Sequence, residues 1–163
     1  CMMFGFSALY HRVDWRARVL IIMRKLDHSA IFVMIAGSFT PICLLVLPGD
    51  RGIQLLLIVW VIAGIGILQT ILFTQTPRLI RAGIYLVAGY MAVPYLSVMF
   101  SVMSMTNFTL TAAGGTIYTV GAIGYGFKFP DISPKYFGYH EFFHILVAIA
   151  AVLHFIVIYS IVG

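Results

Sequence analysis

The sequence predicts an all-α fold, a multi-pass bundle of transmembrane helices. Hydrophobic residues make up 62% of the 163 residues and charged residues only 9%. The mean hydropathy is +1.05, far above the range of soluble globular domains. The apolar residues also fall into runs of about 20, the length of helix that crosses a hydrocarbon core of about 30 Å. These observations together indicate an integral membrane protein.

Five apolar runs are long enough to be complete spans. In chain order they cover residues 29–47, 53–73, 82–105, 108–127 and 139–162. An apolar stretch at residues 1–10 precedes them, and it is too short to cross a bilayer alone. Because the chain begins with Cys inside a helical pattern, we expect residues 1–163 to be a single transmembrane domain that lacks its N-terminal part. Pro41 and Pro94 are expected to kink or end their spans.

Positive charges are distributed unevenly between the two sets of loops that alternating spans create. One side carries nine basic residues, namely Arg12, Arg16, Arg18, Arg24, Lys25, Arg78, Arg81, Lys128 and Lys135. The other side carries only Arg51. Loops rich in Lys and Arg stay in the cytoplasm, so the sequence predicts a cytoplasmic nine-charge side and an extracytoplasmic C-terminus. The excess of basic residues lies in short loops beside spans, where membrane topology and anionic lipid headgroups explain it. It therefore does not indicate nucleic-acid binding.

This topology brings three polar segments to one membrane face. The N-terminal stretch reaches that face at His11, the first complete span leaves it at Asp27, and the last span leaves it at His140. The convergence follows from loop charges alone, without reference to the histidines. We therefore expect the three segments to form one site near the cytoplasmic face.

Histidine spacing at this face is typical of a metal site. His140 and His144 are four residues apart and share one face of a helix, and Ser7 and His11 repeat that spacing. Three imidazoles with Asp27 nearby predict an open tetrahedral zinc site, in which a water acquires a pKa of about 7 and becomes a nucleophile. The structural alternative is that the histidines bond to headgroups and to neighbouring helices.

Three other ionisable residues lie near this site or deeper in the membrane. His28 points about 100° away from Asp27 around a helix, so it is left out of the ligand set. His154 lies roughly 15 Å deeper than His144, and the expected role is a neutral imidazole bonded between helices, with a proton relay or substrate contact as the alternative. Glu141 completes a formal H-E-x-x-H match, which would make it a general base of a metalloprotease. It could equally be a first-turn glutamate that the helix dipole favours.

Small and apolar residues support packing predictions. Glycines at 114, 115, 121 and 124 predict a smooth helix face for close packing. Both cysteines, Cys1 and Cys43, are expected to pack as small apolar side chains rather than form a disulfide. Candidates to hold a lipid acyl chain are Phe32, Met91, Met99 and Phe143.

Four segments together resemble the hemolysin III family, the bacterial branch of the progestin and adipoQ receptors, which include the adiponectin receptors. They are SALYHR at 7–12, LDHSAIFVMIAGSFTP at 26–41, GGTIYTVGAIGYGFKFP at 114–130 and GYHEFFHILVAIAAVLHF at 138–155. The resemblance implies a seven-helix bundle in the plasma membrane of a bacterium. In that bundle the first helix and part of the second would be missing here.

The resemblance also implies a zinc site near the cytoplasmic face. The family's ligands match His11, His140 and His144, and its motif serine and aspartate match Ser7 and Asp27. Related receptors are thought to hydrolyse the amide bond of ceramide. The resemblance thus implies a zinc-dependent lipid amidohydrolase with a ceramide-like membrane lipid as substrate, in which Asp27 and Ser7 are catalytic.

Three other functions remain open from the sequence. The family name reflects a pore-forming hemolysin, so cytolysis is one. A membrane receptor with a structural zinc is another, and an intramembrane protease is the third. The protease is disfavoured because His11 already offers a third ligand.

Overall fold

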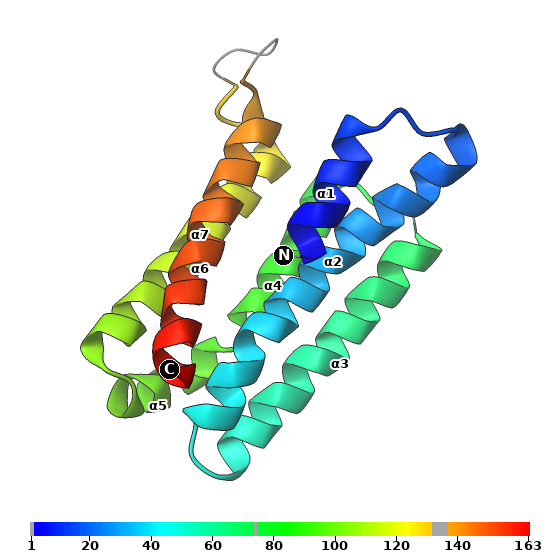
Figure 1. The fold of residues 1–163 in the computed structure, drawn as a ribbon. Coiled ribbons are helices and arrows are strands. Elements are labelled where there is room, and N and C mark those ends of the chain that lie inside the picture. The colour runs from blue at the N-terminus through cyan, green and yellow to red at the C-terminus, as the bar shows by residue number, and fades with distance from the viewer. Residues whose placement is uncertain (1, 74, 132–136) are drawn as a thin grey trace.

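The computed structural model describes residues 2–73, 75–131 and 137–163, and its regular elements there are helices (Figure 1). They are α1 (Met2–Arg12), α2 (Ala17–Leu45), α3 (Asp50–Leu72), α4 (Arg78–Tyr90), the 3₁₀ turn η1 (Val93–Tyr95), α5 (Leu96–Val102), α6 (Met105–Phe127) and α7 (Tyr139–Val162). The predicted all-α class is confirmed. The bounds of α7 coincide with those of the predicted last span.

Four segments among the described residues are long and apolar enough to cross a membrane, namely Ala17–Leu45, Asp50–Leu72, Arg78–Val102 and Tyr139–Val162. Their outward side chains are apolar, and on α3 the residues Leu57, Val61, Ile65 and Leu68 are each more than half exposed. Apolar surface on this scale marks contact with lipid. The chain is an integral membrane protein.

The fourth expected span, residues 108–127, corresponds to α6, which has 23 residues, as α3 does. It is not among the four candidate spans, and its five glycines and five threonines lower its mean hydropathy. Helix α6 nevertheless packs along α7, where a β-carbon on Gly114 would meet His154 and one on Gly121 would approach Leu146. Its crossing of the membrane stays a prediction.

Helix α2 begins well before the expected start of its span at residue 29. At 29 residues it is roughly 43 Å long, more than a hydrocarbon core of about 30 Å requires. Its first turns carry Arg18, Arg24 and Lys25, which a prediction from hydropathy assigns to a loop. The helix therefore extends beyond its apolar part, and it continues through Pro41 to Leu45.

The third span is divided where Pro94 was expected to kink or end it. Helix α4 ends at Tyr90, Pro94 lies within η1, and α5 begins at Leu96. Proline lacks the N–H that would continue the ladder of helical hydrogen bonds, which accounts for the break.

The apolar core lies mainly between α2, α3 and the α4–α5 segment. Phe32 is 1% exposed, and its ring lies 4.8 Å from that of Tyr85, centroid to centroid. Met99 is as deeply buried, and Met91 packs against the same core cluster. Because Phe32 and Met99 are enclosed by protein, the structure places these two acyl-chain candidates in the core.

Close approach of α2 to α3 depends on Gly66, where a β-carbon would lie 2.3 Å from the Phe32 ring. We expect Gly66→Ala to destabilise the bundle by about 1–3 kcal/mol, the usual cost of overpacking. A β-carbon on Gly64 of the same helix would meet nothing within 4 Å, so Gly64→Ala is the matched control. Thermal unfolding in detergent should show a lower midpoint for Gly66→Ala only, and equal midpoints would contradict the packing argument.

Helices α6 and α7 meet along the predicted glycine face. Gly114, Gly121 and Gly124 are buried, whereas a β-carbon on Gly115 would meet nothing within 4 Å. The imidazole Nε2 of His154 lies 3.2 Å from the Thr111 carbonyl, so His154 has the interhelical role expected of it. Cys43 is a buried free thiol, and Cys1 lies outside the described residues.

Candidate metal centre

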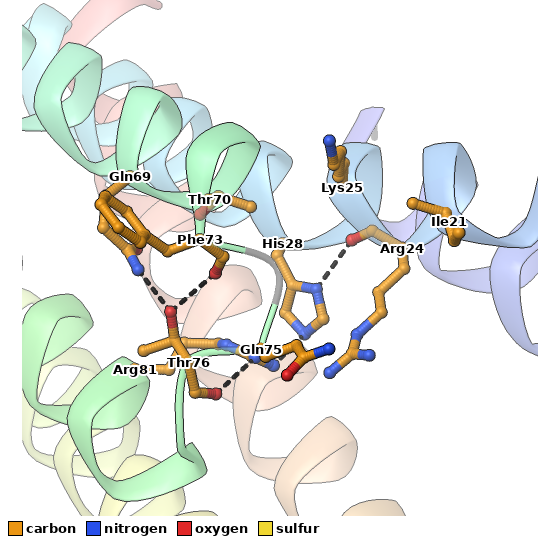
Figure 2. Close-up of a pocket in the computed structure, with 10 residues that line it drawn as sticks. All are labelled: Ile21, Arg24, Lys25, His28, Gln69, Thr70, Phe73, Gln75, Thr76 and Arg81. Carbon is orange, nitrogen blue, oxygen red and sulfur yellow. Dashed lines mark hydrogen bonds between the residues drawn. The ribbon is translucent and has the colours of Figure 1, made fainter.

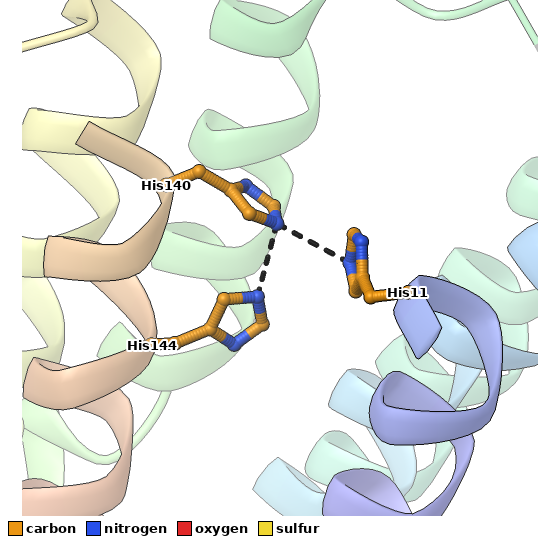
Figure 3. A group of neighbouring side chains, drawn as sticks. All are labelled: His11, His140 and His144. Carbon is orange, nitrogen blue, oxygen red and sulfur yellow. Dashed lines mark hydrogen bonds between the residues drawn. The ribbon is translucent and has the colours of Figure 1, made fainter. Parts of the chain in front are cut away.

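Three histidines from two helices meet at one end of the bundle (Figure 3). His11 lies in the last turn of α1, and His140 and His144 lie in the first two turns of α7. The Nε2 atom of His140 is 3.2 Å from that of His11 and 3.0 Å from that of His144. As predicted, His11 lies beside His140 although the two are far apart in the chain, and His140 and His144 share one face of α7.

The spacing of these nitrogens fits a metal ion. Two ligands of a tetrahedral zinc ion, each at 2.0–2.1 Å, lie about 3.3 Å apart, close to the two Nε2 separations in the cluster. One ligand atom from each histidine falls within 4.8 Å of the others. His11 is exposed and the other two imidazoles are half-buried, so the cluster is accessible from one side.

The donor and acceptor nitrogens available on three neutral imidazoles also favour a cation between the rings. Each neutral imidazole has one donor and one acceptor nitrogen, and only an N–H facing a lone pair forms a hydrogen bond. Here Nε2 of His140 faces the Nε2 atoms of both neighbours at once. A metal ion accepts all three lone pairs, so these side chains could hold one.

Ser7 and Asp27 lie beside this cluster. Each is 8% exposed, and the Ser7 hydroxyl lies close enough to the Asp27 carboxylate to act on it as a donor. Both His11 and Arg81 lie close enough to Asp27 for their charges to act on it. Asp27 is therefore a buried carboxylate between α1 and α4, as well as a neighbour of the histidine cluster.

His28 is not part of the cluster and pairs with Arg81 instead. Its Nδ1 lies 2.7 Å from the Arg24 carbonyl, which can only accept, so Nδ1 carries the proton. The Nε2 lone pair then accepts from Nη1 of Arg81 at 2.7 Å, while Nη2 of Arg81 donates to the Thr76 carbonyl at 2.9 Å. The neutral imidazole and the carbonyl fix the guanidinium in place.

Arg81 is the polar residue near this site that sequence reasoning missed. It is 7% exposed, although the sequence places it among the loop charges. A signal was available, because Arg81 directly precedes an apolar run and lies four residues before Tyr85, whose hydroxyl bonds to the His28 carbonyl. Both residues therefore face α2 from one side of α4.

Glu141 caps the start of α7 and is not one of the three clustered residues. Its Oε2 accepts a hydrogen bond of 3.0 Å from the Gly138 backbone N–H, an N-terminal cap of α7. This contact supports the first-turn role rather than that of a metalloprotease base. His154 is also outside the cluster, as its separation from His144 predicts.

Comparison with known proteins agrees with the resemblance noted in the sequence. The profile of the Haemolysin-III related family matches residues 1–155. The chain is 37% identical over 122 residues to the "Hemolysin-3 homolog" of Bacillus subtilis (strain 168), covering 75% of this chain and 57% of that protein. It is 36% identical over 124 residues to the "Hemolysin-3" of Bacillus cereus, covering 75% and 55%.

A human protein is also similar. The chain is 28% identical over 164 residues to the human "Monocyte to macrophage differentiation factor", covering 98% of this chain and 66% of that protein. The matches thus span little more than half of the two bacterial relatives. The family profile, by contrast, covers nearly all of this chain, which therefore belongs to the Haemolysin-III related family of integral membrane proteins.

Proposed function

We propose that this chain forms the site of a zinc-dependent membrane hydrolase that cleaves the amide bond of a ceramide-like lipid. The observation that carries the proposal is the juxtaposition of three convergent imidazoles with a buried carboxylate and its hydroxyl partner. The cluster would hold zinc through His11, His140 and His144. Asp27 and Ser7 would act on the reacting groups beside it.

Zinc suits this donor set better than harder cations do. Imidazole nitrogens favour zinc and other transition metals, whereas magnesium and calcium prefer oxygen ligands. Three protein ligands with one open position are also the pattern of catalytic zinc sites. When bound, zinc supplies a Lewis acid that polarises a carbonyl and makes a water molecule acidic near neutral pH.

In this proposal Asp27 takes the proton from the water that attacks the amide carbon. It lies near His11 and is shielded from bulk solvent, and a positioned general base typically contributes 10²- to 10⁴-fold to a rate. The nearby Ser7 hydroxyl would donate to the carboxylate and help to orient it. The nitrogen of the departing amine must then receive a proton, which Asp27 can return.

The depth of the cluster matches a carbonyl near the lipid headgroup. His140 and His144 belong to the first two turns of α7, which places them within roughly 10 Å of the end of the span. The amide of a ceramide-like lipid lies at such a level, between its headgroup and its acyl chains. A substrate diffusing in the membrane would approach between helices.

We further propose that this end of the bundle faces the cytoplasm of a bacterium. Eight of the nine basic residues predicted to be cytoplasmic lie within described residues. They belong to the last turn of α1, the link to α2, the first nine residues of α2, the start of α4 and the residue after α6, at the end of the bundle where α1 ends and α7 begins (Figure 1). Lys135 lies outside the described residues. The excess of basic residues supports this orientation through the positive-inside rule.

Metal analysis combined with a lipid-amide assay tests the proposal. Purified full-length protein should contain about one zinc per chain, the number that one tetrahedral site holds, and should release fatty acid from a short-chain ceramide in detergent. Chelation should stop the release, and zinc should restore it. Folded, metal-replete protein that contains zinc but cleaves no amide or ester lipid would refute the hydrolase and leave the receptor with a structural metal.

A pore is the second candidate because one relative is named "Hemolysin-3". The interior between α2, α3 and α5 is filled by a core that includes Phe32, Leu55 and Met99, which disfavours a path through this bundle. Leakage of dye from lipid vesicles without amide hydrolysis would favour the pore.

A further inference from the structure

A second polar site lies on the α3 and α4 side of α2 (Figure 2). It is a pocket of about 190 Å³ between the N-terminal turns of α2, the end of α3 and the start of α4. That volume is several times the roughly 30 Å³ that one water molecule occupies in the liquid, so a phosphate group fits. Its lining residues are Ile21, Arg24, Lys25, His28, Gln69, Thr70, Phe73, Gln75, Thr76 and Arg81.

The charges of this pocket are of one sign. Arg24, Lys25 and Arg81 line it, and none of the described lining residues is acidic. His28 adds no negative charge, because its neutral ring accepts from Arg81. Asp27 acts on Arg81 from beyond the pocket and can offset about one of the three positive charges.

The polar groups of the pocket are also held in place. Arg81 is fixed by His28 and the Thr76 carbonyl. Gln69 donates to the Thr76 hydroxyl at 2.6 Å, which in turn donates to the Phe73 carbonyl at 2.7 Å. Figure 2 shows Arg24, His28 and Gln75 among the side chains that line the pocket. An ordered guanidinium with amide donors nearby suits the oxygens of a phosphate.

Apolar surface adjoins these charges. Ile21 and Phe73 line the pocket and are themselves 53% and 64% exposed. A neighbouring open hollow of about 490 Å³ shares Phe73 and adds Leu72 and Pro77. A ligand with a phosphate beside hydrocarbon chains would therefore meet complementary surface in both hollows.

We propose that this pocket binds the phosphate group of an anionic membrane lipid. The site differs from the histidine cluster in its residues and in its chemistry, and it does not depend on the proposed hydrolase activity. Basic pockets between transmembrane helices are suited to anionic headgroups. Because the adjoining surface is apolar, a lipid is favoured over free phosphate as the source of the anion.

Native mass spectrometry of the full-length protein in detergent provides the test, with phosphatidylglycerol, phosphatidylcholine and inorganic phosphate as separate probes. Phosphatidylcholine carries the same phosphate with a compensating cation, so it should bind more weakly than phosphatidylglycerol. We expect Arg24→Gln to weaken binding of phosphatidylglycerol about tenfold or more, the effect of losing one charge-assisted hydrogen bond. Lys25→Gln is a second variant that leaves the buried Arg81 untouched.

Arg18→Gln is the matched control, because Arg18 is an exposed arginine on α2 that does not line the pocket. Arg18→Gln removes one positive charge, as Arg24→Gln does, but it should leave binding of phosphatidylglycerol unchanged. Equal affinity in wild type, Arg24→Gln and Lys25→Gln would overturn the proposal, as would equal weakening by Arg18→Gln. Saturable binding of inorganic phosphate without binding of phosphatidylglycerol would overturn the assignment to a lipid.

Discussion

Replacing His140 by alanine is expected to abolish metal binding and, with it, the proposed hydrolysis. His140 is the central member of the cluster, since its Nε2 faces those of both His11 and His144. Changing a residue that only supports a metal ligand typically costs 10- to 100-fold in affinity. We therefore expect the loss of a ligand to cost at least about 100-fold, measured by zinc content after purification and by titration with a zinc-competing dye.

His154→Ala is the matched control for this variant, because it removes an imidazole from the same helix. His154 bonds to the Thr111 carbonyl and lies outside the cluster, so the variant should keep its zinc even if its unfolding temperature falls. Zinc retained at wild-type affinity by folded His140→Ala protein would contradict the assignment. Loss of zinc from both variants would show that the metal is sensitive to helix packing rather than to His140 itself.

Asp27→Asn is expected to lower the rate of lipid-amide hydrolysis by roughly 10²- to 10⁴-fold, the range for loss of a general base. The amide keeps the size of the side chain and can still pair with the Ser7 hydroxyl, but it cannot take up a proton. Zinc content should be unchanged because the three imidazoles remain. The measurement is kcat for fatty-acid release from a short-chain ceramide, alongside zinc content.

Asp14→Asn serves as the control for Asp27, because Asp14 is an exposed carboxylate in the link between α1 and α2. It should hydrolyse lipid at the wild-type rate. An unchanged rate in Asp27→Asn would remove Asp27 from the mechanism. A variant that loses zinc together with activity would instead indicate that Asp27 stabilises the metal site.

Local patterns in the sequence account for the parts of the fold that depend on hydropathy and helical spacing. The bounds of α7 follow from an apolar run that starts directly at Tyr139, and His140 and His144 meet because residues four apart share a helix face. To predict that His11 meets these two histidines, it was enough to alternate the spans and to count the basic residues in the loops. Each inference relies on spacing within one helix or on the order of helices along the chain.

Features that depend on side-chain partners in other helices were not predictable in this way. Hydropathy separates Arg24 and Lys25 from the span, yet the α2 backbone continues through them because helical hydrogen bonds do not require an apolar environment. The pairing of His28 with Arg81 links α2 to α4, and a pattern within either helix does not contain that contact. Similarly, the burial of Phe32 depends on the small size of Gly66 in α3.

The shared face of Ser7 and His11 limits where the chain can change in length. Ser7 lies beside Asp27 of α2, while His11, one turn further along α1, faces the histidines of α7. One inserted residue turns everything beyond it by about 100° and advances it by about 1.5 Å. An insertion between the two would thus preserve one contact and misdirect the other. The link at residues 13–16, which carries neither side chain, can absorb added or deleted residues, so variation in length should be tolerated there.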